Sequence, residues 1–163
     1  MPTRRTLLLG TLPALLLAGC GFRLRGDYRF AFQTIKLGFA QRSEIGDELR
    51  RQLAAAPDVR VVESAKDAQV VLEVLEDRVS RSASASTAAG QVREITLRTR
   101  LRFRLLTAAG RELIPETELV LSQLLSYNET DALGKESEEA ELVRDMRRDI
   151  VAQVMRRLAA VEL

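Results

Sequence analysis

Residues 92–105 read Val-Arg-Glu-Ile-Thr-Leu-Arg-Thr-Arg-Leu-Arg-Phe-Arg-Leu and show the most regular alternation in the chain. One phase is largely apolar and contains Ile95, Leu97, Leu101, Phe103 and Leu105. The other phase contains Arg98, Arg100, Arg102 and Arg104. Successive side chains of a β-strand point to opposite faces of its sheet. The segment is therefore predicted to be a strand with one buried and one charged face, and its length of about 14 residues exceeds the usual 5–6.

Weaker alternations on both sides of this segment predict further strands. We expect three of them, at residues 35–39, from about 68 to 74, and at 113–127, and residues 59–62 fit a short extended piece. Ala108-Ala109-Gly110 is expected to form the turn that joins the long strand to the last one.

Residues 80–90 contain no large apolar side chain and are rich in Ser and Ala. Such a composition alone is also typical of disorder. Because strands are predicted on both sides, we interpret these residues as the far end of a long hairpin that turns near Ala89-Gly90.

Two amphipathic stretches predict helices. Residues 44–56 place apolar side chains on one helical face, with Ser43 as N-cap and Pro57 as the stop. After the candidate N-cap Asp131, apolar residues recur at steps of three and four, at Val143, Met146, Ile150, Val154, Leu158 and Val161. The predicted fold is α+β, in the order β-α-β-β-β-α, with two helices packed on one face of a four-stranded mixed sheet.

The first twenty residues have the parts of an export signal. Residues 1–5 are basic, residues 7–17 are mostly apolar, and Leu17-Ala18-Gly19-Cys20 follows. The apolar run is shorter than the about 20 residues of a membrane span and fits the hydrophobic region of a secretory signal. Arg4-Arg5 leaves twin-arginine export open beside the general secretory route.

The string Leu17-Ala18-Gly19-Cys20 resembles the lipobox of bacterial lipoproteins. The resemblance implies cleavage before Cys20 and lipidation of its thiol, whereas a buried cysteine is the alternative. Residue 21 is Gly, not Asp, which in lipoproteins is associated with sorting to the outer membrane. We expect a signal peptide at 1–19, a lipidated tether at 20–29 and a single domain at 30–163.

Composition argues against several classes of function. The chain has no His and one Cys, so it lacks the commonest general base, the commonest zinc ligand and any intrachain disulfide. It contains no serine-nucleophile string of the kind found in hydrolases, and no obvious carboxylate pair for acid–base hydrolysis. We expect no catalytic residue, no cofactor and no metal.

The net charge gives little support to nucleic-acid binding. Two of the 25 basic side chains, Arg4 and Arg5, lie in the predicted leader, and the remainder equal the 23 acidic ones in number. A nearly neutral domain lacks the electrostatic footprint of a nucleic-acid binder. Nucleic acid is therefore not an expected partner.

Three segments resemble the LptE family of lipopolysaccharide-assembly lipoproteins. Residues 20–26 are similar to the start of the mature family members, residues 127–139 to the start of the last helix, and residues 142–149 to its continuation. The resemblance implies a non-catalytic, lipid-anchored protein on the periplasmic side of the outer membrane. Such a protein plugs the LptD β-barrel, assists its assembly and takes part in inserting lipopolysaccharide into the outer leaflet. Lys135 lies in the matching stretch and is a candidate contact to lipopolysaccharide.

The arginine phase of residues 98–104 has two interpretations. In one, the arginines pair with Glu116 or Glu118 on the neighbouring strand and form a solvated face, each pair contributing about 0.2–1 kcal/mol. In the other, they bind the phosphates of lipopolysaccharide, which suit guanidinium groups. A hydrophilic flank suits the polar interior of a large barrel. A periplasmic lipoprotein that uses the same sheet to bind another envelope protein remains the alternative function.

Overall fold

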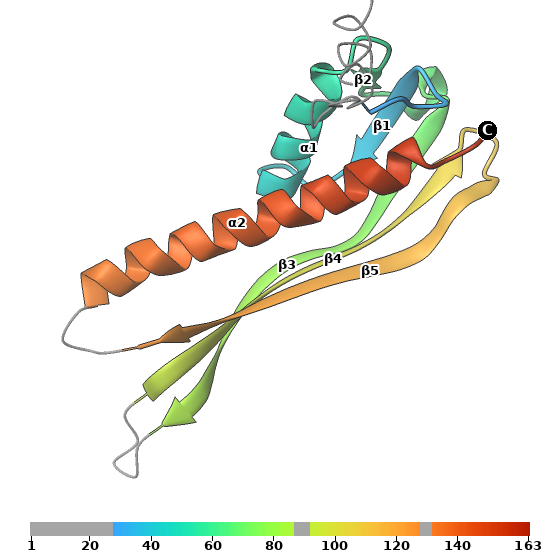
Figure 1. Cartoon of the computed structure of the whole chain (residues 1–163). Coiled ribbons are helices and arrows are strands. Elements are labelled where there is room, and N and C mark those ends of the chain that lie inside the picture. Colours follow the sequence, from blue (N-terminus) through green and yellow to red (C-terminus); the bar gives the residue numbers. More distant parts are fainter. Residues whose placement is uncertain (1–27, 87–91, 128–131) are drawn as a thin grey trace, which may run out of the picture.

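The computed structural model describes residues 28–86, 92–127 and 132–163, and within them two helices lie on one side of a twisted sheet (Figure 1). The strands are β1 (Thr34–Gly38), β2 (Arg60–Val62), β3 (Val70–Ser86), β4 (Val92–Thr107) and β5 (Glu112–Ser126). The helices are α1 (Glu44–Ala54) and α2 (Ala132–Ala159), and a short 3₁₀ helix, η2 (Ala65–Asp67), precedes β3. The α+β class and the two helices on one face are confirmed.

The sheet has five strands, so the prediction of four was wrong. Its order is β2-β1-β3-β4-β5, in which β1 is parallel to β2 and β3 while β3, β4 and β5 are antiparallel neighbours. The additional strand is β2, which arises from the extended piece expected at 59–62 and pairs Val61 with Ile35. Three residues are too few for an alternation to identify a strand. The element order is therefore β-α-β-β-β-β-α.

Helix α1 begins where the sequence predicts. The Ser43 hydroxyl accepts a hydrogen bond from the Gly46 N–H at 2.9 Å, as an N-cap does. The helix ends at Ala54, three residues before Pro57, and its apolar face is buried. At Gly46 a Cβ atom would lie 2.8 Å from the Phe39 ring, so the helix needs glycine there to approach the chain that follows β1.

The turn between β4 and β5 is the one predicted. Thr107 and Arg111 close it through a 2.8 Å backbone hydrogen bond, and Gly110 adopts a φ of 85°. This left-handed conformation favours glycine in a three-residue hairpin loop. The hairpin of β3 and β4 is confirmed by antiparallel pairing that reaches Ser86 and Val92, while the turn predicted near Ala89-Gly90 lies outside the described residues.

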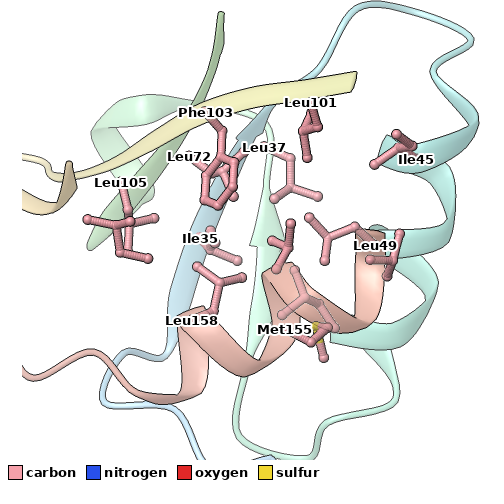
Figure 2. Close-up of a cluster of buried hydrophobic side chains, with 14 of the residues drawn as sticks. Ile35, Leu37, Ile45, Leu49, Leu72, Leu101, Phe103, Leu105, Met155 and Leu158 are labelled. Carbon is pink, nitrogen blue, oxygen red and sulfur yellow. The ribbon is translucent and has the colours of Figure 1, made fainter. Parts of the chain in front are cut away.

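The apolar phase of β4 spans two core clusters. The larger lies between the sheet, α1 and the second half of α2, and Figure 2 shows side chains of both helices facing those of the strands. The smaller comprises Ile95, Leu97, Leu125, Val143 and Met146. The stripe predicted for the last helix is buried from Val143 to Leu158, whereas Val161 follows the helix and is half-buried.

Thr99 lies on β4 between these two clusters and is fully buried. It shares the core face with Leu97 and Leu101, and it is opposite Val79 on β3 and Leu121 on β5. Its hydroxyl has no hydrogen-bond partner among the described residues. A buried hydroxyl without a partner costs about 1–3 kcal/mol, so Thr99 is a weak point in the core.

We predict that Thr99→Val raises the free energy of unfolding by about 1 kcal/mol, because it removes an unpaired hydroxyl and keeps the branched shape. Urea denaturation measures the change. Thr117→Val is the control, since the Thr117 hydroxyl donates to the Pro115 carbonyl at 2.8 Å, and this variant is not expected to gain stability. A loss of stability in Thr99→Val would contradict the prediction.

Candidate functional site

The four arginines of β4 lie on the sheet face that carries no helix. The side chains of Arg100, Arg102 and Arg104 are 37%, 40% and 41% exposed, so their aliphatic stems lie on the sheet while their guanidinium groups reach water. The charged phase predicted for this strand is confirmed. Together with the neighbouring side chains of β3 and β5, these residues form what we call the arginine face.

Glutamates on both neighbouring strands neutralise most of the arginine face. The N···O distances of the ion pairs are 2.7 Å for Arg104–Glu73, 3.2 Å for Arg102–Glu116, 3.1 Å for Arg100–Glu118 and 4.0 Å for Arg100–Glu76. The predicted pairing with Glu116 and Glu118 is therefore confirmed. Arg98 instead donates to the Ser122 hydroxyl at 3.2 Å and has no carboxylate partner in the described part of the chain.

Sequence reasoning missed the partners on β3. Glu73 and Glu76 are three residues apart, so a regular strand would point them to opposite faces. A bulge between Val74 and Glu76 shifts the register, and both glutamates then lie opposite arginines of β4. The only available signal was the excess of acidic residues after residue 72, and it does not specify a bulge.

The pairing decides what the arginine face can do chemically. Within residues 92–104 the basic side chains outnumber the acidic ones. In the folded structure, however, four glutamates of β3 and β5 lie beside the arginines. A phosphate group would have to compete with these carboxylates at Arg100, Arg102 and Arg104. Arg98, and Arg78 of β3 opposite Arg100, have no carboxylate partner among the described residues. The geometry is that of a hydrated surface with charges of both signs.

Lys135 does not join the arginine face. It lies in the first turn of α2, on the helical side of the sheet, and its Nζ is 2.8 Å from Glu138 Oε2. The structure thus separates the two groups of candidate lipopolysaccharide contacts that the sequence suggested. Cys20 and the candidate N-cap Asp131 lie outside the described residues.

A second mixed-charge site lies on the helical side, near the start of α2. Arg81 of β3 is 3.2 Å from Glu139 of α2, and its guanidinium lies 5.6 Å from the centre of the Tyr127 ring. These residues line a hollow of about 560 Å³ that also includes Glu44 and Arg144. Sequence analysis missed the site because its members come from four separate segments of the chain.

The acidic side chains of the described residues can be compared with the needs of a metal site and of a general acid. They contain no group of three or more His, Cys, Asp or Glu side chains arranged to hold a metal. Hydrogen bonds from Gln52 and Arg51 hold the pKa of Glu48 below its ordinary value. That direction keeps Glu48 ionised and is opposite to the raised pKa of a general acid. Within the same ranges, no helix combines the length and apolar character of a membrane span.

Comparison with known proteins identifies the family. The family model described as LptE, lipopolysaccharide-assembly, matches residues 32–158. The chain belongs to the LptE family. The resemblance in residues 127–139 and 142–149 is thereby confirmed at the level of the family. The LptE-family chain is accordingly a lipopolysaccharide-assembly lipoprotein of the cell envelope. A search of curated protein sequences finds no match.

Solved structures show the same fold. Lipoprotein B of Nitrosomonas europaea is 28% identical, with a TM-score of 0.72 over 86% of the LptE-family chain and 91% of the other. Rare lipoprotein B of Shewanella oneidensis is 21% identical, with a TM-score of 0.65 over 78% and 95%. A minor lipoprotein of Acinetobacter baumannii is 19% identical, with a TM-score of 0.64 over 81% and 94%. The match covers 91%, 95% and 94% of these three chains, so the fold is shared along nearly the whole of each.

We predict a favourable coupling of about 0.2–1 kcal/mol between Arg102 and Glu116, the range of exposed cross-strand ion pairs. A double-mutant cycle with Arg102→Gln and Glu116→Gln, followed by urea denaturation, measures it. The coupling should decrease in 1 M salt, which screens exposed charges. Arg98 and Glu116 provide the control cycle, with no coupling expected. Zero coupling between Arg102 and Glu116 at low salt would contradict the presence of this ion pair.

Proposed function

We propose that this LptE-family chain is a non-catalytic outer-membrane lipoprotein that plugs an LptD-type β-barrel and assists its assembly. In this role it takes part in lipopolysaccharide insertion into the outer leaflet. The observation that carries the proposal is the family match over residues 32–158. The arginine face, the β3–β4 hairpin and the leader each add physical support.

The arginine face suits the wet interior of a barrel. Porin-like barrels have polar interiors, and a plug needs a surface that is stable against both water and polar walls. Exposed ion pairs meet this need, because each charge keeps a partner when part of its hydration is lost. The pairs Arg104–Glu73 and Arg102–Glu116 show that this pairing exists within the domain itself.

The hairpin suits close contact with a partner. Figure 1 shows the C-terminal end of β3 and the N-terminal end of β4 projecting away from α1 and β1. Residues 82–86 of β3 are only Ser and Ala, and Ser84 is hydrogen-bonded to Thr96 across the hairpin. Side chains this small contribute little to a core, but they let a neighbouring backbone approach the strands closely.

A lipid anchor at Cys20 would hold the domain at the membrane. The string Leu17-Ala18-Gly19-Cys20 supports cleavage and lipidation, and several acyl chains on one residue give stable anchoring where one chain gives only marginal binding. Gly21 supports the outer membrane as destination, with the domain on its periplasmic side.

Depletion of the chain in cells tests the proposed function. We expect assembly of the LptD-type barrel and surface lipopolysaccharide to fall together, because both depend on the plug. Re-expression of the wild-type chain restores both, and Cys20→Ala restores less because the lipid anchor is lost. If barrel assembly remains normal, the periplasmic adaptor becomes the better account.

We further propose Lys135, Arg98, Arg100, Arg102 and Arg104 as contacts to lipopolysaccharide phosphates. Among the arginines, Arg98 has the guanidinium that is least engaged by carboxylates. We expect Arg98→Gln to lower the affinity for purified lipopolysaccharide, and its salt dependence, more than Arg104→Gln does. Arg111→Gln, in the β4–β5 turn, is the control. Equal binding by all three variants would remove the arginine face from the proposed contacts.

A further inference from the structure

Strand β5 is a long edge strand, and no described segment pairs with its outer side. The sheet ends at β5 on one side and at the three-residue β2 on the other. Proteins commonly protect such edges with charges, prolines or bulges. In β5 these features are confined to the first half, which contains Glu112, Pro115, Glu116 and Glu118.

The second half of β5, Leu119–Ser126, contains neither a charge nor a proline. On the sheet face away from the helices, Val120 and Leu124 are 41% and 60% exposed. Leu124 is the most exposed large hydrophobic residue in the described part of the chain. An uncharged aliphatic edge of this kind is a template for pairing with another strand.

We propose that a second copy of this chain pairs with the edge, antiparallel, about a two-fold axis through Ser122. Such a contact is isologous, so each residue pair occurs twice. With the axis at Ser122, Val120 of each copy lies opposite Leu124 of the other, and both side chains are on the same face of the joined sheet. The two most exposed apolar residues of the edge thus cover each other.

The charges of β5 also favour this register. Glu118 lies opposite Ser126 of the second copy, and Glu116 and Pro115 fall beyond the end of its β5. No acidic residue therefore faces another, and the proline does not interrupt the seam. An axis through Val120 would instead place Leu124 opposite Glu116, which leaves an aliphatic side chain against a carboxylate.

The joined edges form a small interface. An interface made by a single pair of strands buries little surface, as weak protein–protein contacts do. We therefore expect a reversible dimer with a Kd in the micromolar range. The dimer uses neither the lipid anchor nor the paired arginines. It is a property of the chain apart from any barrel, and its test does not depend on the proposed function.

Disulfide trapping tests the register. The full chain with Cys20→Ser carries either Ser122→Cys or, as the matched exposed control, Ser126→Cys. Facing Cβ atoms at the axis lie about 4.5–5.5 Å apart, close to disulfide distance, whereas the two residues 126 lie about 27 Å apart along the strands. We expect rapid oxidation to a dimer only with Ser122→Cys. No dimer, or equal dimer formation by the two variants, would overturn the proposal.

Sedimentation of the full chain as a function of concentration provides the second readout. Leu124→Lys should raise the dimer Kd by at least about tenfold, because the two-fold axis introduces the charge twice. Leu75→Lys is the control, since Leu75 is 41% exposed on the interior strand β3, and it should leave the Kd unchanged. Circular dichroism verifies the fold of each variant. A wild-type chain that stays monomeric, or a Kd unaffected by Leu124→Lys, would contradict the pairing.

Discussion

The rest of the structure depends on one constraint: strand β4 carries apolar side chains on one face and arginines on the other. Its apolar phase, from Ile95 to Leu105, needs burial along nearly the full strand, and both helices lie on that side. Its arginine phase cannot be buried at acceptable cost, because a desolvated charge without a partner is strongly destabilising. The domain is therefore a one-sided sheet, with all described helices on one face and charges on the other.

This one-sidedness has consequences for the flanking strands. Because the arginines stay at the surface, β3 and β5 contribute carboxylates beside them, and the bulge after Val74 brings Glu76 to the same face as Glu73. The result is an exposed surface that carries charges of both signs. Such a surface is compatible with the polar bore of a barrel, whereas an apolar face would favour a lipid-facing or obligate protein contact.

Local signals predicted much of the fold. The phases of β4, the N-cap Ser43, the turn at Gly110 and the stripe from Val143 to Leu158 depend on neighbours within a few residues, and all agree with the structure. Strand β2 was expected only as a short extended piece and not as a strand of the sheet, because its three residues are held by β1 rather than by their own pattern.

The candidate sites were less predictable, because their residues meet through the tertiary fold. Glu73 and Glu76 share a face only through a bulge, and Arg81 meets Tyr127 and Glu139 only when hairpin and helix pack. The family itself was recognisable from short segments near both ends of the chain. Lipidation at Cys20, the barrel partner and the lipopolysaccharide contacts remain predictions.

The most direct test of the central claim is photo-crosslinking from the arginine face in living cells. A photoreactive residue at position 100 or 118, in the full-length chain, should crosslink to an LptD-type β-barrel that co-purifies with the chain from solubilised outer membranes. This result is expected if the charged face lies against the bore. Recovery of the chain free of any barrel, with no crosslink from either position, would contradict the account.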